Sequence, residues 1–118
     1  MDFKSKVAEC HQRLGQIHEI NGNLDLAIEE RKKFLEITKD DSSAEGMRAQ
    51  VEAYKQLADT YSKDKKIGPA IDNLREMLNI AVESSDNNAK SEAALKLGLL
   101  FYKPGQRNNA KQSAEYLS

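Results

Sequence analysis

Hydrophobic side chains near the start of the chain recur at steps of three and four residues, the spacing of one face of an α-helix. This stripe consists of Phe3, Val7, Cys10, Leu14, Ile17 and Ile20. The segment Asn21-Gly22-Asn23 ends it, because Gly22 can adopt the positive φ of a helix end and Asn23 can cap the next helix. A second helical stripe comprises Leu24, Ala27, Ile28, Phe34, Leu35 and Ile37. The pattern predicts a helical hairpin over about residues 3–41.

The same spacing predicts two further hairpins, over about residues 44–84 and 88–118. The second has the stripes Met47, Val51, Tyr54, Leu57, Ala58, Tyr61 and Ile67, Ala70, Ile71, Leu74, Met77, Leu78, Ala81, Val82, with a turn at residues 64–66. The third has Ala93, Ala94, Leu97, Leu100, Phe101, a break at Pro104-Gly105, and then Ala110, Ala114, Leu117. No segment alternates with the period of a half-buried strand. We therefore expect an all-α protein with six helices in three hairpins.

Three sets of landmarks show that the hairpins are repeats. Leu14-Gly15, Leu57-Ala58 and Leu97-Gly98 stand 43 and 40 residues apart. An alanine follows each leucine by 13 residues (Ala27, Ala70, Ala110), and a large apolar residue follows by 20 (Phe34, Met77, Leu117). The small residues make sense where two helices approach closely. We call the three hairpins the first, second and third units of one domain.

These landmarks resemble the tetratricopeptide repeat family. The first unit matches its pattern best, with Leu14, Gly15, Gly22, Ala27 and Phe34 in place. The second unit departs from it at Ala58 and Lys65, and His18 replaces the usual tyrosine of the first. Steps of 43 and 40 exceed the usual period of about 34 residues, as in the long-repeat branch of the family. The resemblance implies a short right-handed α-solenoid. The segments FLEITKDDSSAEG and AYKQLADTYSK are most similar to axonemal dynein-associated members, which implies a ciliary role.

The last unit lacks the polar capping helix that usually ends a solenoid. Arg107 and Lys111 stand where the first two units carry Leu24 and Ile67 or Ile28 and Ile71. We therefore expect the chain to be a piece of a longer solenoid. The alternative is that another chain covers its end.

Charge and composition restrict the possible partners. The chain has 18 Lys and Arg against 19 Asp and Glu, a formal net charge of −1, which argues against a nucleic-acid binder that relies on bulk charge. The basic clusters at residues 31–33 and 63–66 lack interleaved aromatic residues. We expect neither nucleic-acid binding nor membrane insertion, since no apolar run reaches the length of a membrane span. A single cysteine and the absence of a secretory signal predict a cytoplasmic protein, within the cytoskeleton or cilium if the resemblance holds.

Candidates for chemistry are few. His11 and His18 lie seven residues apart with Cys10 adjacent, but a zinc site needs four such ligands at matched spacings. The histidines occupy aromatic positions of the repeat, so we expect them to pack against the core, and Cys10 to be a small core residue. No phosphate-binding loop or nucleophile elbow is present. We predict no cofactor, no metal and no enzymatic activity.

The resemblance implies that the first helix of each unit lines a concave groove that receives a peptide or a helix of a partner protein. Carried over by alignment, the groove residues are Glu9, Gln12, Gln16, Glu19, Glu52, Lys55, Asp59, Ser62, Glu92, Leu95, Leu99 and Tyr102. One relative grips the C-terminal carboxylate of chaperones, and of its matching positions (Gln12, Gln16, Gln56, Glu92, Lys96) only Lys96 fits. The acidic groove residues would repel such a tail.

The apolar stripe Leu95, Leu99 and Tyr102 interrupts this polar surface. It can bind a partner helix, pack against a following helix of a longer protein, or be buried in a homodimer. Two functions remain open. One is a scaffold or adaptor module that binds a mixed basic and apolar ligand. The other is a structural solenoid segment that mediates self-association or assembly through its exposed apolar ends.

Overall fold

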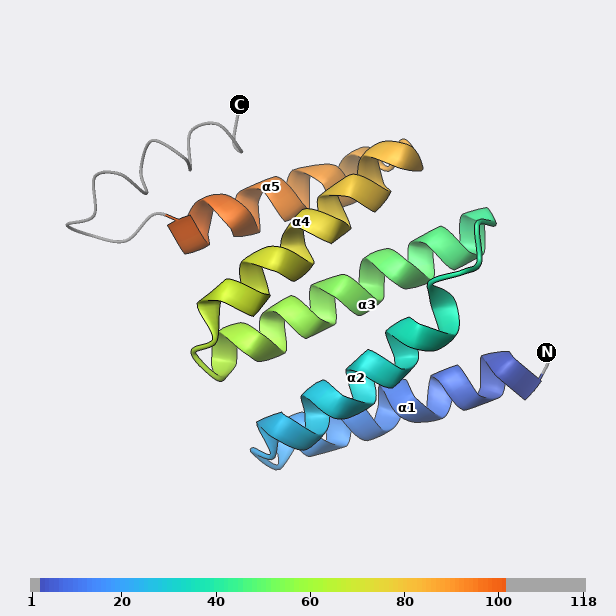
Figure 1. The fold of residues 1–118 in the computed structure, drawn as a ribbon, viewed down its shortest axis with the longest axis vertical. Helices are drawn as coiled ribbons and strands as arrows, with labels where there is room; N and C mark the ends of the chain where they lie inside the picture. Colours follow the sequence, from blue (N-terminus) through green and yellow to red (C-terminus); the bar gives the residue numbers. More distant parts are fainter. Residues whose placement is uncertain (1–2, 102–118) are drawn as a thin grey trace.

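A computed structural model describes residues 3–101, which form five α-helices (Figure 1). They are α1 (Phe3–Ile20), α2 (Leu24–Thr38), α3 (Ala44–Lys63), α4 (Ile67–Glu83) and α5 (Asn87–Phe101). No strand occurs within these residues, so the predicted all-α class is confirmed. The first two predicted hairpins are the pairs α1–α2 and α3–α4, and α5 is the first helix of the third. The second helix predicted for the third unit lies outside the described residues.

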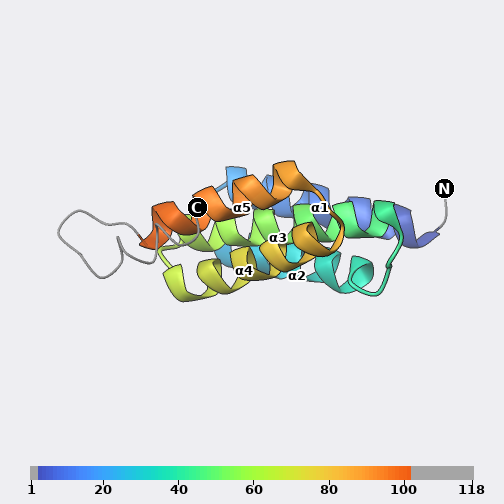
Figure 2. The ribbon, with the colours of Figure 1, turned by 90° about the horizontal axis from the view of Figure 1, so that it is seen from above.

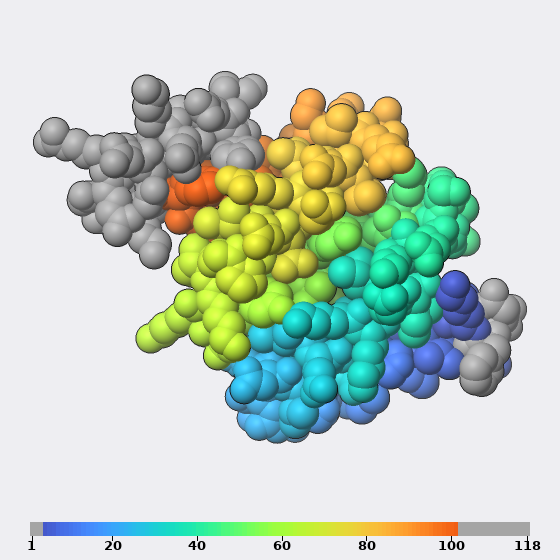
Figure 3. All heavy atoms as spheres, in the orientation of Figure 1, coloured from blue at the N-terminus to red at the C-terminus, as the bar shows by residue number. Residues whose placement is uncertain are grey.

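The helices form an extended array of two layers. Each helix packs mainly against the next in the chain, from α1 to α5, and the units lie side by side along the longest axis (Figures 1 and 3). Seen from above, α1, α3 and α5 lie toward one side and α2 and α4 toward the other (Figure 2). The extents of the chain are 48 × 34 × 17 Å. This is the arrangement of a helical solenoid, in which the first helices of successive units share one surface.

The three turns between successive helices that follow α1, α3 and α4 share one geometry. Gly22, Lys65 and Ser85 have φ angles of 81°, 60° and 57°. In each turn the N–H of this residue donates to the carbonyl three positions back, and the next N–H donates to the carbonyl five positions back, which satisfies the last carbonyls of the helix. The prediction for Gly22 is confirmed. Asn23 stands at the N-cap of α2, but its side chain makes no capping hydrogen bond.

The core is densest between the second unit and α5. Leu74, Met77 and Leu97 are almost completely buried there, and Leu57 is equally buried in a second cluster that includes α2. The repeat alanines Ala27 and Ala70 have no exposed surface, which agrees with the expectation that small residues allow two helices to approach closely. The apolar stripes predicted for α3, α4 and α5 therefore supply most of the buried core.

The stripe predicted for α1 is more exposed than the sequence suggests. Leu14 is 41% exposed, whereas Leu57 and Leu97, at the same position of their units, are 1% and 0% exposed. In the second and third units this position packs beneath the second helix of the preceding unit, and the described chain has no hairpin before α1. Cys10 is exposed for the same reason, although Ala53 matches it in the second unit and is fully buried. The prediction that Cys10 is a core residue is therefore wrong.

A candidate protein-interaction groove

Eleven of the twelve predicted groove residues lie within the described chain, on the first helices of the three units. Tyr102 lies outside it. Two cavities open between α1 and α3. One, of about 260 Å³, is lined partly by Glu19, Asp59 and Ser62. The other, of about 390 Å³, is lined partly by Glu9 and Gln12. Five of the predicted residues thus border hollows between these two helices.

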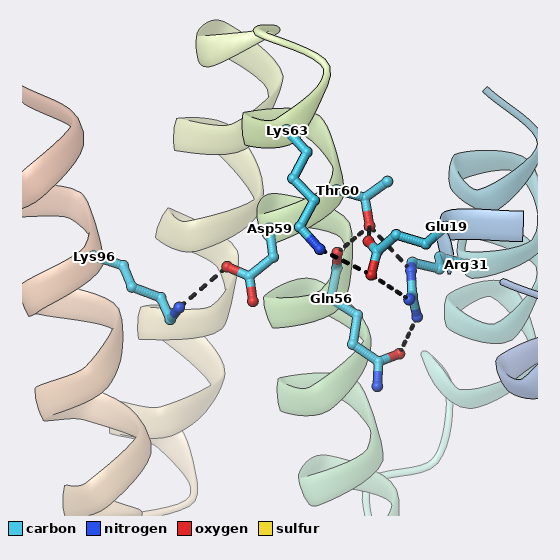
Figure 4. Close-up of polar contacts among 7 residues, drawn as sticks. All are labelled: Glu19, Arg31, Gln56, Asp59, Thr60, Lys63 and Lys96. Carbon is cyan, nitrogen blue, oxygen red and sulfur yellow. Dashed lines mark hydrogen bonds and ion pairs between the residues drawn. The ribbon is translucent and has the colours of Figure 1, made fainter. Parts of the chain in front are cut away.

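The smaller cavity contains a buried arginine. Arg31, on α2, is only 4% exposed. Its Nε donates to Thr60 Oγ1 at 3.1 Å and its Nη1 donates to Gln56 Oε1 at 2.8 Å, both on α3 (Figure 4). Its Nη2 lies 3.6 Å from Glu19 Oε2. Buried charges are tolerated only when they are paired and hydrogen-bonded, and Arg31 meets both conditions. These contacts join the first unit to the second.

Glu19 is the acidic centre of this cluster. Its Oε2 lies 3.2 Å from Lys63 Nζ, and its Oε1 lies 2.6 Å from the Thr60 hydroxyl. That hydroxyl is also 2.8 Å from the Gln56 carbonyl oxygen, so its single proton serves one acceptor at a time. Burial opposes ionisation of Glu19, but the hydrogen bonds from Thr60 and Lys63 and the charge of Arg31 outweigh it and lower the pKa of this carboxyl. Glu19 therefore remains ionised and links α1 to α3.

Ion pairs also link α3 to α5. Lys96 Nζ lies 3.1 Å from Asp59 Oδ1 (Figure 4), and Lys55 Nζ lies 3.4 Å from Glu92 Oε1. Burial would lower the pKa of Lys55, but Glu52 and Glu92 outweigh this effect and raise it. Three predicted groove residues, Lys55, Asp59 and Glu92, therefore take part in ion pairs between α3 and α5. Because these side chains are partly exposed, each pair contributes little to stability, but together they give the surface a fixed pattern of charge.

The α5 part of the surface exposes two large apolar side chains. Leu95 is 51% exposed and Leu99 is 64% exposed, although Leu97 between them is fully buried. Lys96, next to Leu95, turns toward Asp59 on α3. The exposed leucines thus border a row of charged side chains, and large apolar groove residues occur on α5, beside Glu92, but not on α1 or α3.

Sequence reasoning missed the role of Arg31, which it placed in a short basic surface cluster with Lys32 and Lys33. The repeat register contained the missing signal. Arg31 follows Ala27 by four residues, and the corresponding residue of the second unit is Leu74, which is 2% exposed. A charged residue at a buried repeat position indicates a polar partner across the interface, here Thr60 and Gln56.

The histidines and the cysteine do not converge. His11 is partly buried, and its Nδ1 lies 2.6 Å from Glu30 Oε2 on α2, while His18 is partly buried at the other end of α1. Within residues 3–101, no three His, Cys, Asp or Glu side chains are grouped so that they could hold a metal ion. Within the same residues, no helix is both long and apolar enough to span a membrane.

Comparison with known proteins identifies the first unit. A family model described as tetratricopeptide repeat matches residues 8–41, from the first half of α1 to the loop after α2. The resemblance found in the sequence is therefore confirmed over this unit. Repeats of this family generally mediate protein–protein interactions. No curated protein matches the chain, so the similarity to axonemal dynein-associated members stays a prediction.

Proposed function

Since residues 8–41 form a tetratricopeptide repeat, we propose that the chain is a non-catalytic adaptor or scaffold module. It binds a peptide or a helix of a partner protein in the groove formed by α1, α3 and α5, in the cytoplasm or a cytoskeletal structure such as the cilium. The contact residues are the predicted groove residues given above.

One observation carries this proposal: two large leucines, Leu95 and Leu99, are exposed on α5 beside a surface of paired charges. Exposed apolar patches on a polar surface mark interaction sites. The two leucines are four residues apart on one helix face, which is the spacing by which a helix presents side chains to a partner. The neighbouring charges on α3 add electrostatic specificity.

The test compares Leu99→Glu with Val82→Glu. Both residues have exposed aliphatic side chains, but Val82 lies on α4, outside the predicted groove. Each variant is used as bait in extract of the source cell, and partners captured by the unmodified protein are identified and then measured with purified components. We expect Leu99→Glu to lose the partner and Val82→Glu to retain it, with unchanged helicity in both. Equal retention by both variants contradicts groove binding.

A second candidate function is assembly through the end of the solenoid, and the exposed face of α1 favours it. Leu14, Ile17 and Ile20 are exposed at positions related by helical spacing. On α3 and α5 the corresponding apolar residues are covered by the unit that precedes each helix. A second copy of the chain could cover the apolar face of α1 in the same way. The test is the mass in solution over a concentration series, for the unmodified protein and for Ile17→Asp. A dimer that dissociates in the variant supports this function, and a monomer at all concentrations contradicts it.

A further inference from the structure

The larger cavity, of about 390 Å³, lies where the first half of α1, the end of α2 and the start of α3 meet. Its floor is apolar. Ala8 and Phe34 belong to a buried cluster, against which Ile37 and Ala49 pack, and all four line the cavity. The floor can therefore take several methylene groups out of water, which is favourable.

The wall formed by the loop between α2 and α3 is held rigidly. The buried Gln50 side chain donates to the carbonyl oxygens of Thr38 at 3.0 Å and of Asp41 at 2.8 Å. Asp41 Oδ1 accepts from the Ser43 N–H at 2.9 Å. A Cβ at Gly46 would clash with the side chain and the carbonyl oxygen of Asp41, so only glycine allows the loop to approach α3 this closely. Asp41 is thus preorganised at the rim, which reduces the entropy lost on binding.

The rim is acidic. Asp41, Glu45 and Glu9 line the cavity with one cation, Lys4. Arg13 Nη2 lies 2.7 Å from Glu9 Oε1 and so balances the charge of Glu9. At the rim, the two negative charges of Asp41 and Glu45 then face the single positive charge of Lys4. The hydrogen bonds from Ser43 lower the pKa of Asp41, so this carboxylate stays charged. An uncharged apolar side chain would desolvate these carboxylates without compensation, and an anion would be repelled.

We propose that this cavity receives a lysine or arginine side chain of the partner peptide. The methylene groups lie on the floor and the cation lies beside Asp41 and Glu45, because long basic side chains bury their stems while the charged head stays near water and counter-charges. The inference rests on the proposed function for its partner, and it deepens it: the ligand carries a basic residue for the start of α1 and α3 and an apolar residue for Leu95 and Leu99 on α5.

The test uses butylguanidinium, which mimics an arginine side chain, and butylurea, its uncharged analogue, in amide NMR titrations of the ¹⁵N-labelled chain up to about 50 mM, a range suited to so small a ligand. We expect butylguanidinium to shift the amides of Ala8, Phe34 and Ala49, and butylurea to bind at least about threefold more weakly. Glu45→Gln should weaken butylguanidinium about threefold, and Lys4→Gln should strengthen it about twofold, since one removes an attractive and the other a repulsive charge. Glu83→Gln, at an exposed residue at the end of α4 that does not line the cavity, is the matched control and should bind like the unmodified chain.

Equal binding of the two probes, shifts away from the cavity, or no shifts at all overturns the inference. So does an unchanged affinity in both Glu45→Gln and Lys4→Gln. The titration needs no partner, whereas the Leu99→Glu comparison does. The two proposals can therefore fail separately. If the cavity binds butylguanidinium but Leu99→Glu still binds the partner, only the groove proposal fails.

Discussion

Replacement of Arg31 tests how the first unit is attached to the second. Arg31 lies on α2 and donates hydrogen bonds to Thr60 and Gln56 on α3. The same position of the second unit is occupied by Leu74, which packs in the apolar core between α4 and α5. The same repeat position is thus occupied by a charged residue in the first unit and by an apolar residue in the second. The informative pair of variants is Arg31→Ala, which removes the side chain, and Arg31→Leu, which imitates the second unit.

The expected effect of Arg31→Ala follows from the contacts it deletes. Each of the two hydrogen bonds contributes about 1 kcal/mol. Loss of the buried stem adds about 1–2 kcal/mol in transfer and cavity terms. The ion pair to Glu19 adds little, because its separation is 3.6 Å and Lys63 remains 3.2 Å from the same oxygen. We expect the free energy of unfolding to fall by about 3 kcal/mol, a large part of the stability of a small domain.

Arg31→Leu should lose much less. Leucine restores most of the buried volume, and it removes the need to desolvate a guanidinium, so replacement of a buried charge by an apolar residue is often neutral or stabilising. Thr60 keeps its contacts to Glu19 and to the Gln56 carbonyl. Thr60 Oγ1 and Gln56 Oε1 each lose the hydrogen bond that Arg31 donates, but the Thr60 hydroxyl still has an acceptor for its proton and the Gln56 side chain is only partly buried. We expect the leucine variant to lie within about 1 kcal/mol of the unmodified protein.

The assay is equilibrium unfolding in urea, followed by far-UV circular dichroism, since guanidinium chloride would screen the ion pairs. Lys33→Ala is the control for loss of a basic residue, because Lys33 is exposed. If Arg31→Leu is as unstable as Arg31→Ala, the polar contacts and not the buried volume hold the interface, and the reasoning is refuted. If Arg31→Ala lowers the free energy of unfolding by less than about 1 kcal/mol, the Arg31 side chain is not buried in the folded protein.

Three further predictions concern turns, close contacts and pH. Lys65→Gly should raise the free energy of unfolding by about 0.5–1 kcal/mol in urea melts, because a non-glycine residue at φ 60° is strained where Gly22 supplies glycine. Gly46→Ala should lower it by about 2 kcal/mol, because the added methyl meets the backbone of Asp41; an unchanged melt would mean that the loop moves freely. The pKa of Glu19 is lowered in the folded state, so its contribution is present above its unfolded pKa and is lost as pH falls through the folded value. Glu19→Gln should therefore flatten the decline of stability between about pH 5 and pH 3. An unchanged slope would show that Glu19 does not contribute to this decline.

The sequence predicted the helices and their pairing because both depend on local patterns. The positions of Leu57 and Leu97 were read correctly as core, and Gly22 was read correctly as a helix end. The wrong predictions concern residues whose burial depends on a neighbouring helix. Cys10 and Leu14 have the same helical spacing as their buried counterparts, but whether such a stripe is covered depends on a preceding helix, which periodicity does not report.

The polar interface was unpredictable for a related reason. Propensity and charge runs place Arg31 on a solvated face, since an isolated lysine or arginine is rarely buried. Its burial follows from three partners on other helices, Glu19, Gln56 and Thr60, that lie between 12 and 29 residues away. Only the repeat register indicates that Arg31 is buried, because it aligns Arg31 with the buried Leu74 of the second unit.

The two interfaces between units therefore differ in kind, and the difference affects the groove. The second unit holds α5 through one large buried apolar cluster, whereas the first unit is held to α3 by two smaller apolar clusters together with a charged cluster that includes the predicted groove residue Glu19. In a solenoid, stability is a sum of the stabilities of the units and of the interfaces between neighbours. A ligand that binds between α1 and α3 contacts both helices of this interface directly, so binding there should stabilise the first unit in particular. A ligand confined to Leu95 and Leu99 contacts only the third unit and leaves this interface unchanged. Amide hydrogen exchange of α1 and α2, measured with and without the captured partner, distinguishes these two modes of binding.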